Sequence, residues 1–191
     1  MILAYLIFAH LLGDFVFQPS ALVKWKMKSM WGTLTHVAVH FLVNLFILLP
    51  FIINGYFELI YFVLGICFIH FWIDEAKINY DLKHDLKVRP FVIDQLLHMF
   101  TILVANFFLM EKLFVLPGNT FYKLYANINI IIFLSFLVVV STVIEVYNLQ
   151  KEREKNSNTN VHIDSKNMLS RIIVFTLLYS LFMFVTFLMA K

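Results

Sequence analysis

Four pairs of side chains of the kinds that bind metals lie inside hydrophobic segments of this sequence. In each pair the two members are four residues apart: His10 and Asp14, His36 and His40, His70 and Asp74, and Asp94 and His98. Residues four apart on an α-helix lie on one face, about one turn from each other, so each segment directs two coordinating groups the same way. An ionisable group at the centre of a membrane helix costs about 2.5 to 3.5 kcal/mol. Repeating that cost in four segments indicates that the eight groups act together.

The donor set predicts a site for divalent cations. Imidazole and carboxylate together suit Zn, Mn, Fe, Ni or Co. One tetrahedral zinc ion needs three or four protein ligands, so eight candidates are enough for two ions, or for one ion whose ligands are supported by Asp–His hydrogen bonds. Zinc is favoured, with manganese or iron as alternatives. A metal-free proton relay or polar packing network is the competing interpretation.

Other polar residues near the pairs are candidates for supporting roles. Asp14, Asp74 and Asp94 are candidate general bases, and Lys77 could neutralise an anionic substrate or pair with Asp74. Candidates for hydrogen bonds to ligands or substrate are Gln18, Gln95 and Glu145, although Gln95 follows Asp94 on a different helix face. Structural pairing is an open alternative for Lys77, Gln18 and Gln95. We interpret Lys24, Lys26, Lys28, Lys87 and Arg89 as topology determinants that contact anionic lipid.

The composition is that of an integral membrane protein. Of 191 residues, 61% are hydrophobic and 14% are charged, whereas soluble domains have about 45 to 50% apolar and about 25% charged residues. Hydrophobic segments cover residues 2–17, 31–53, 56–73, 91–114, 127–146 and 168–190, and most have the roughly 17 to 25 residues that cross a bilayer. The sequence predicts an all-α polytopic membrane protein of about six spans, with residues 1–191 forming one transmembrane domain.

The basic residues predict the orientation. The connections after the first, third and fifth segments, with the first turn of the sixth, hold 12 of the 15 Lys and Arg residues. By the positive-inside rule these connections are cytoplasmic, so both termini are outside a multi-pass protein of the cell (inner) membrane. All four ligand pairs then lie at a similar depth, near the cytoplasmic leaflet.

A weak internal repeat divides the chain. The sequence F-A-H-L-L-G-D in the first segment parallels F-I-H-F-W-I-D in the third, and each is followed by a segment that opens with a second pair. We therefore expect residues 1–114 to form two pseudo-repeated helical hairpins around the site. Residues 127–190 are expected to supply two buttressing helices, and residues 150–166 a polar cytoplasmic loop.

Four stretches of the sequence resemble one family. H-L-L-G-D-F-V-F-Q, H-V-A-V-H, H-F-W-I-D-E-A-K and F-V-I-D-Q-L-L-H, in this order within roughly residues 1 to 110, resemble a bacterial integral-membrane family catalogued as domain of unknown function 3307. The resemblance supports the site but implies no reaction. The pattern is also similar to that of bacterial inner-membrane proteins described as metal-dependent hydrolases.

The favoured function is a membrane-embedded, metal-dependent hydrolase. Two metal ions about 3.5 to 4 Å apart form the usual site for hydrolysing phosphate esters or amides. The expected substrate is amphipathic, such as a phospholipid or an isoprenoid phosphate. The alternatives are a divalent-cation or proton transporter and a non-catalytic protein with a structural metal. The sequence contains no nucleic-acid-binding motif, and it leaves the oligomeric state open.

Overall fold

The computed structural model describes residues 1–110, 112–155 and 165–189, and these form helices and connections without a strand. The elements are α1 (Ile2–Leu11), the π-helical η1 (Leu12–Val16), α2 (Ser20–Lys26), α3 (Met30–Ile52), α4 (Glu58–Asp81), α5 (Val88–Leu109), α6 (Thr120–Tyr125), α7 (Ile128–Val138), the π-helical η2 (Val139–Val143), α8 (Ile144–Lys155) and α9 (Ser165–Met189). The prediction of an all-helical chain is confirmed.

Four helices are long and apolar enough to cross a membrane. These are α3, α4, α5 and the continuous rod α7–η2–α8, which covers 28 residues from Ile128 to Lys155. The α1–η1 segment passes the same test only together with α2, from which it is bent by 90°. The apolar part of α9, Asn167–Met183, is shorter. The chain is therefore a membrane protein with four candidate spans, or five if the bent pair is one span.

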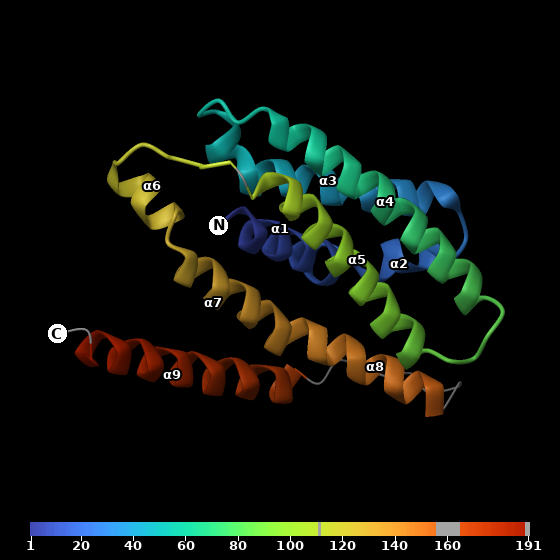
Figure 1. Cartoon of the computed structure of the whole chain (residues 1–191). Helices are drawn as coiled ribbons and strands as arrows, with labels where there is room; N and C mark the ends of the chain where they lie inside the picture. Colours follow the sequence, from blue (N-terminus) through green and yellow to red (C-terminus); the bar gives the residue numbers. More distant parts are fainter. Residues whose placement is uncertain (111, 156–164, 190–191) are drawn as a thin grey trace.

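The N-terminal helix lies at the centre of the bundle. Helix α1 packs against α3, α5 and α7, and seven of its ten residues are buried. Tyr5, which is fully buried, meets the ring of Phe51 edge to face with 5.3 Å between centroids. Helix α9 packs against η2 and α7 at the periphery. Figure 1 shows the N-terminus, the α3–α4 connection and α6 at one end of the bundle, and α2, the α4–α5 connection and the end of α8 at the other.

Three predicted boundaries differ from the structure. The third hydrophobic segment continues as α4 to Asp81, where Lys77 and Asp81 form an i,i+4 ion pair of 3.3 Å. The fourth segment ends at Leu109, and 113–114 follow it as coil. The predicted loop 150–166 begins as helix, because Glu154 of α8 accepts the backbone N–H groups of Lys87 and Val88 at 2.9 and 2.7 Å. The part of that loop at 156–164 lies outside the described residues.

Helix α2 was not predicted, and Gly32 explains how it packs. A Cβ atom on Gly32 would lie 2.5 Å from the backbone nitrogen of Lys26 and 2.5 Å from the carbonyl carbon of Trp25. Only glycine therefore lets the backbone of α2 approach α3 this closely. Ser29 accepts the backbone N–H of Trp31 at 3.2 Å and caps α3 directly after this contact. The bend and the close approach direct Lys26 toward the interior.

Candidate metal centre

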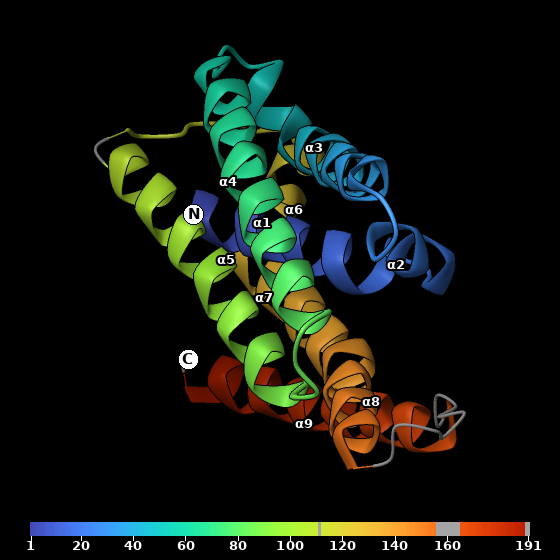
Figure 2. The same ribbon diagram turned by 90° about the vertical axis from the view of Figure 1, so that its right-hand side faces the viewer.

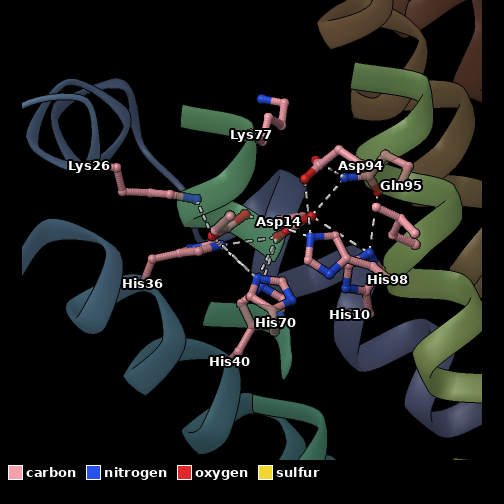
Figure 3. A network of polar contacts seen from close by, with 12 residues as sticks. His10, Asp14, Lys26, His36, His40, His70, Lys77, Asp94, Gln95 and His98 are labelled. Atoms are coloured by element: carbon pink, nitrogen blue, oxygen red, sulfur yellow. Dashed lines mark hydrogen bonds and ion pairs between the residues drawn. The ribbon is translucent and has the colours of Figure 1, made fainter. Parts of the chain in front are cut away.

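The eight side chains of the four i,i+4 pairs lie in one buried cluster (Figure 3). They are contributed by α1 and η1, the first turns of α3, the second half of α4 and the first turns of α5. No side chain of the eight is more than 7% exposed. Asp14 lies in the π-helical turn η1, a distortion that is common at functional sites. The predicted convergence of the four pairs is therefore present in the fold.

Asp14 joins all four helices, since Gln95 of α5 also donates to its Oδ2. Its Oδ1 accepts hydrogen bonds from His36 Nε2 at 3.1 Å and from His40 Nε2 at 2.8 Å. His70 Nε2 lies 3.7 Å from the same oxygen. The other oxygen, Oδ2, is 3.6 Å from His10 Nε2. Each carboxylate oxygen of Asp14 thus faces a different set of imidazole rings.

Asp74 also directs its two oxygens to different partners. Oδ2 accepts a hydrogen bond from the ammonium group of Lys26 at 2.6 Å and lies 3.6 Å from the Nε2 atoms of both His36 and His70. Oδ1 lies 3.6 Å from His98 Nε2. Asp74 therefore belongs to two neighbouring groups of donor atoms, one with His36 and His70 and one with Asp94 and His98.

The last pair contains buried atoms that lack hydrogen bonds. His98 Nε2 and Asp94 Oδ1 lie 3.4 Å apart, and neither atom has a hydrogen-bond partner in the described part of the chain. A buried polar atom without a partner costs about 1 to 3 kcal/mol. The two atoms face each other at a distance at which both could bind one metal ion.

The spacing of the donor atoms fits tetrahedral coordination. The clustered residues form three groups: His10, Asp14, His40 and His70; His36, His70 and Asp74; and Asp74, Asp94 and His98. Zinc ligands lie about 2.0 to 2.1 Å from the ion, which places tetrahedral ligands about 3.3 to 3.4 Å from one another. Separations of 3.3 Å for His70–His36, 3.4 Å for His98–Asp94 and 3.6 Å for His70–Asp74 are close to this value. His70 belongs to the first and second groups, and Asp74 belongs to the second and third. Neighbouring groups of donor atoms therefore share a residue.

The charges favour a cation over a network of protonated rings. Among the described residues, Lys26 forms a direct ion pair with Asp74, whereas Lys77, paired with Asp81, acts on Asp94 only from a greater distance. Asp14 and Asp94 therefore carry two negative charges without a direct ammonium partner. The imidazoles are poorly placed to carry both charges, because the rings of His70 and His98 stack at 3.9 Å between centroids and those of His40 and His70 lie at 4.1 Å. The Nε2 atoms of His36 and His70 also face each other at 3.3 Å. Adjacent imidazolium rings would repel at these distances.

Both candidate glutamines contact the cluster. Gln95 donates to Asp14 Oδ2 at 2.9 Å and to Asp94 Oδ2 at 3.2 Å, and its Oε1 lies 3.3 Å from His10 Nε2. It therefore connects α5 to α1, although its place in the sequence suggests a different face from Asp94. The amide of Gln18 lies 3.2 Å from the ring of His36 and is oriented to accept from Lys26 Nζ at 2.9 Å.

The other two candidates form their ion pairs outside the cluster. Lys77 pairs with Asp81, and no dashed line joins it to the cluster in Figure 3. Glu145 forms an ion pair with Arg171 of α9, and Arg171 also donates to the carbonyl of Val140 at 2.9 Å. The described contacts of Glu145 therefore connect α8 to α9 and do not reach the metal ligands.

Sequence reasoning missed two residues at the cluster. Lys26, interpreted as a topology determinant, forms the buried ion pair with Asp74. Asn44, which is 3% exposed, donates to the carbonyl of His40 at 2.9 Å. Asn44 continues the i,i+4 series of His36 and His40 by one more turn, and this spacing could have revealed it. The local sequence contains no comparable signal for Lys26.

Replacing Glu145 with Gln separates structural pairing from a role at the metal. We expect Glu145→Gln to retain the wild-type metal content, because its partner is Arg171. Loss of the charged hydrogen bond should lower the free energy of unfolding by roughly 1 to 3 kcal/mol. Elemental analysis and thermal unfolding of the purified variant measure the two effects, with Arg171→Gln as the matched control. A selective fall in metal content in Glu145→Gln would contradict this assignment.

One comparison with known proteins identifies a family. The model of the family described as "Protein of unknown function (DUF3307)" matches residues 2–120, which include all eight clustered ligands. No curated protein and no solved structure matches the chain significantly. The matched region covers more than half of the sequence and contains the four motifs on which the resemblance was based. The chain therefore belongs to the DUF3307 family.

Proposed function

We propose that the chain is a membrane-embedded, metal-dependent hydrolase with two adjacent divalent-cation positions, zinc being the favoured ion. The observation that supports this best is the sharing of His70 and Asp74 between neighbouring donor groups. Asp74 directs one oxygen toward His36 and His70 and the other toward His98. Two adjoining cation positions built from carboxylates and imidazoles suit a two-metal hydrolytic site.

The residues can be assigned roles in hydrolysis of a phosphate ester. A pair of bound divalent ions would supply a Lewis acid for water and a counter-charge for the leaving oxygen. Asp14, Asp74 and the Oδ1 atom of Asp94 would hold the ions, and Oδ2 of Asp94 would accept the proton of the attacking water. The P–O ester bond breaks, the hydroxyl group of water joins phosphorus, and the leaving alkoxide receives a proton. Lys77 would neutralise part of the phosphate charge.

The membrane arrangement extends this proposal. We infer six spans in the bacterial inner membrane, with both termini outside and the site near the cytoplasmic leaflet. The basic residues of α2, of the α4–α5 connection and of the end of α8 lie at one end of the bundle, the same end to which the cluster is closer. An amphipathic substrate, such as a phospholipid or an isoprenoid phosphate, could then reach the site from the bilayer.

Elemental analysis of the purified protein tests the proposal. We expect two divalent ions per chain, and we expect phosphate release from dioleoyl phosphatidic acid in mixed micelles. Removal of the ions by a chelator should abolish phosphate release, and re-addition of Zn²⁺ should restore it. A preparation that binds no divalent ion after equilibration with buffered Zn²⁺ would refute the proposal.

Two other outcomes would favour the alternatives. Full metal content without hydrolysis of any phosphate ester or amide offered would favour a structural site. Movement of Zn²⁺ across proteoliposome membranes at a rate that depends on His70 would favour transport. Both outcomes count against a hydrolase, because the same ligands would then serve a structural or transport role in which no substrate bond is broken.

A further inference from the structure

A groove runs between α4 and α5, the two helices that contribute His70, Asp74, Asp94 and His98. The helices lie side by side in both views (Figures 1 and 2). One hollow of about 420 Å³ lies toward the basic end, and a second of about 450 Å³ extends along the helices. Ile73 and Leu97 line both hollows, so the two adjoin.

The longer hollow presents an apolar surface. Its lining includes Ile69, Phe100 and Phe108, whose side chains are about half or more exposed. The hydroxyl group of Thr101 donates to the carbonyl of Leu97 at 3.0 Å within α5, so it offers the groove no free donor. Both helices are candidate spans. This hollow therefore faces hydrocarbon, and it suits the tail of a lipid.

The hollow at the basic end presents charge. Its lining includes Lys77, Tyr80, Arg89 and Asp94. The exposed Arg89 has no ion pair or hydrogen bond within the described ranges. Asp94 also lines this hollow, although it is 7% exposed and its Oδ1, which has no hydrogen-bond partner in the described chain, lies 3.4 Å from His98 Nε2. Of the three clustered carboxylates, only Asp94 lines this hollow, so the hollow adjoins the candidate metal centre there.

We propose that this groove binds a lipid with an anionic phosphate head group. The tail lies along the apolar hollow, and the phosphate lies between Arg89 and Lys77, beside Asp94. A guanidinium group matches phosphate geometrically with two parallel N–H donors. As the substrate groove of a hydrolase this rests on the proposed function, because cations at the cluster would offset the repulsion between Asp94 and phosphate. As a lipid site it can be tested separately.

Lipid binding to the full chain can be measured by native mass spectrometry from detergent micelles. The probes are dioleoyl phosphatidic acid, which is anionic, and dioleoyl phosphatidylcholine, which is zwitterionic. We expect Arg89→Gln to weaken phosphatidic acid binding by about tenfold, the effect of one hydrogen bond between charged groups. Lys83→Gln removes a neighbouring exposed charge that does not line the groove, so it should bind phosphatidic acid like the wild type.

The apolar half needs its own variant. A Cβ atom on Gly65 would meet no atom within 4 Å, so Gly65→Phe can fill the groove without a clash with the protein at its Cβ position. We expect this variant to weaken binding of both probes by about tenfold. Leu42→Phe, at a position of α3 that is 63% exposed, is the matched control and should bind both lipids normally.

The metal content of each preparation separates the two proposals. Variants with wild-type metal content and weakened lipid binding support the groove. Unchanged phosphatidic acid binding in both Arg89→Gln and Gly65→Phe would overturn the groove and leave the metal site standing. Equal affinity of the wild type for the two lipids would also overturn the groove, because nonspecific lipid contact does not distinguish anionic from zwitterionic head groups. Arg89-dependent binding in a protein that holds no metal would overturn the hydrolase and retain the lipid site.

Discussion

His40→Ala is expected to lose most of its bound metal and its hydrolytic activity while remaining in the membrane. The Nε2 atom of His40 belongs to the group of donors that includes His10, Asp14 and His70, and it lies 2.8 Å from Asp14 Oδ1. Loss of a residue that only supports a ligand weakens metal binding by about 10- to 100-fold. Loss of a ligand should therefore weaken it by more than about 100-fold. The number of Zn²⁺ ions per chain, measured after equilibration with buffered Zn²⁺, tests this.

His84→Ala is the matched control for this loss. His84 follows α4, where its ring stacks on Tyr80 with 4.1 Å between centroids, and it is exposed. Its removal should leave the metal content and the amount of protein in the membrane fraction unchanged. Wild-type metal content in His40→Ala would contradict the assignment of His40. Loss of the protein from the membrane fraction would show that the side chain is needed for folding. The variant Gly13→Ala, which removes no ligand, would then provide the test.

The convergence of the four pairs could be predicted from sequence because their spacing is local. Two side chains four residues apart share a helix face whatever the rest of the fold does. The four pairs also alternate between the C-terminal part of one segment and the N-terminal part of the next, so antiparallel helices bring them to one level. Gln95 shows the limit of this reasoning. Its position next to Asp94 indicated another face, but its longer side chain reaches back to Asp14 and His10 of the central helix.

The role of Lys26 could not be predicted from its spacing. It depends on the 90° bend after η1 and on the close approach of α2 to Gly32. Both are contacts between segments, and neither leaves a periodic signal in the sequence. A lysine beside a hydrophobic segment is well explained by the positive-inside rule. The fold adds a second role, because Lys26 compensates one of the three buried carboxylates.

Depth in the membrane was a weaker guide than spacing. Glu145 lies near the same end of the bundle as the ligands, yet its ion pair is with Arg171. A carboxylate at the depth of the cluster can be neutralised by a basic side chain on a neighbouring helix, just as it can by a metal ion. The predicted loop at 150–166 was wrong at 150–155, which belong to α8. Polar composition alone indicated a loop, whereas Glu154 anchors this end of α8 to the first backbone N–H groups of α5.

Gly13→Ala is expected to weaken metal binding without removing any ligand. A Cβ atom at this position would lie 2.4 Å from Cε1 and 2.5 Å from Nε2 of His40. The ring would have to retreat by about 1 Å to restore ordinary contact. It has little room to do so, because the ring of His70 is 4.1 Å away between centroids and the adjoining cavity holds only about 10 Å³. Binding sites require their donors to be placed within about 0.5 Å.

The methyl group should therefore reduce Zn²⁺ affinity by at least about tenfold, comparable to the loss of a supporting residue. Gly65→Ala supplies the matched control, because it adds the same methyl group to a helix where no atom lies within 4 Å of it. That variant should keep its metal and gain roughly 0.5 to 1 kcal/mol of helix stability. Competition with a chromophoric zinc chelator measures both affinities. Equal affinities in the two variants would mean that the position of the His40 ring does not determine metal binding, and His40 would then be a packing residue beside Asp14.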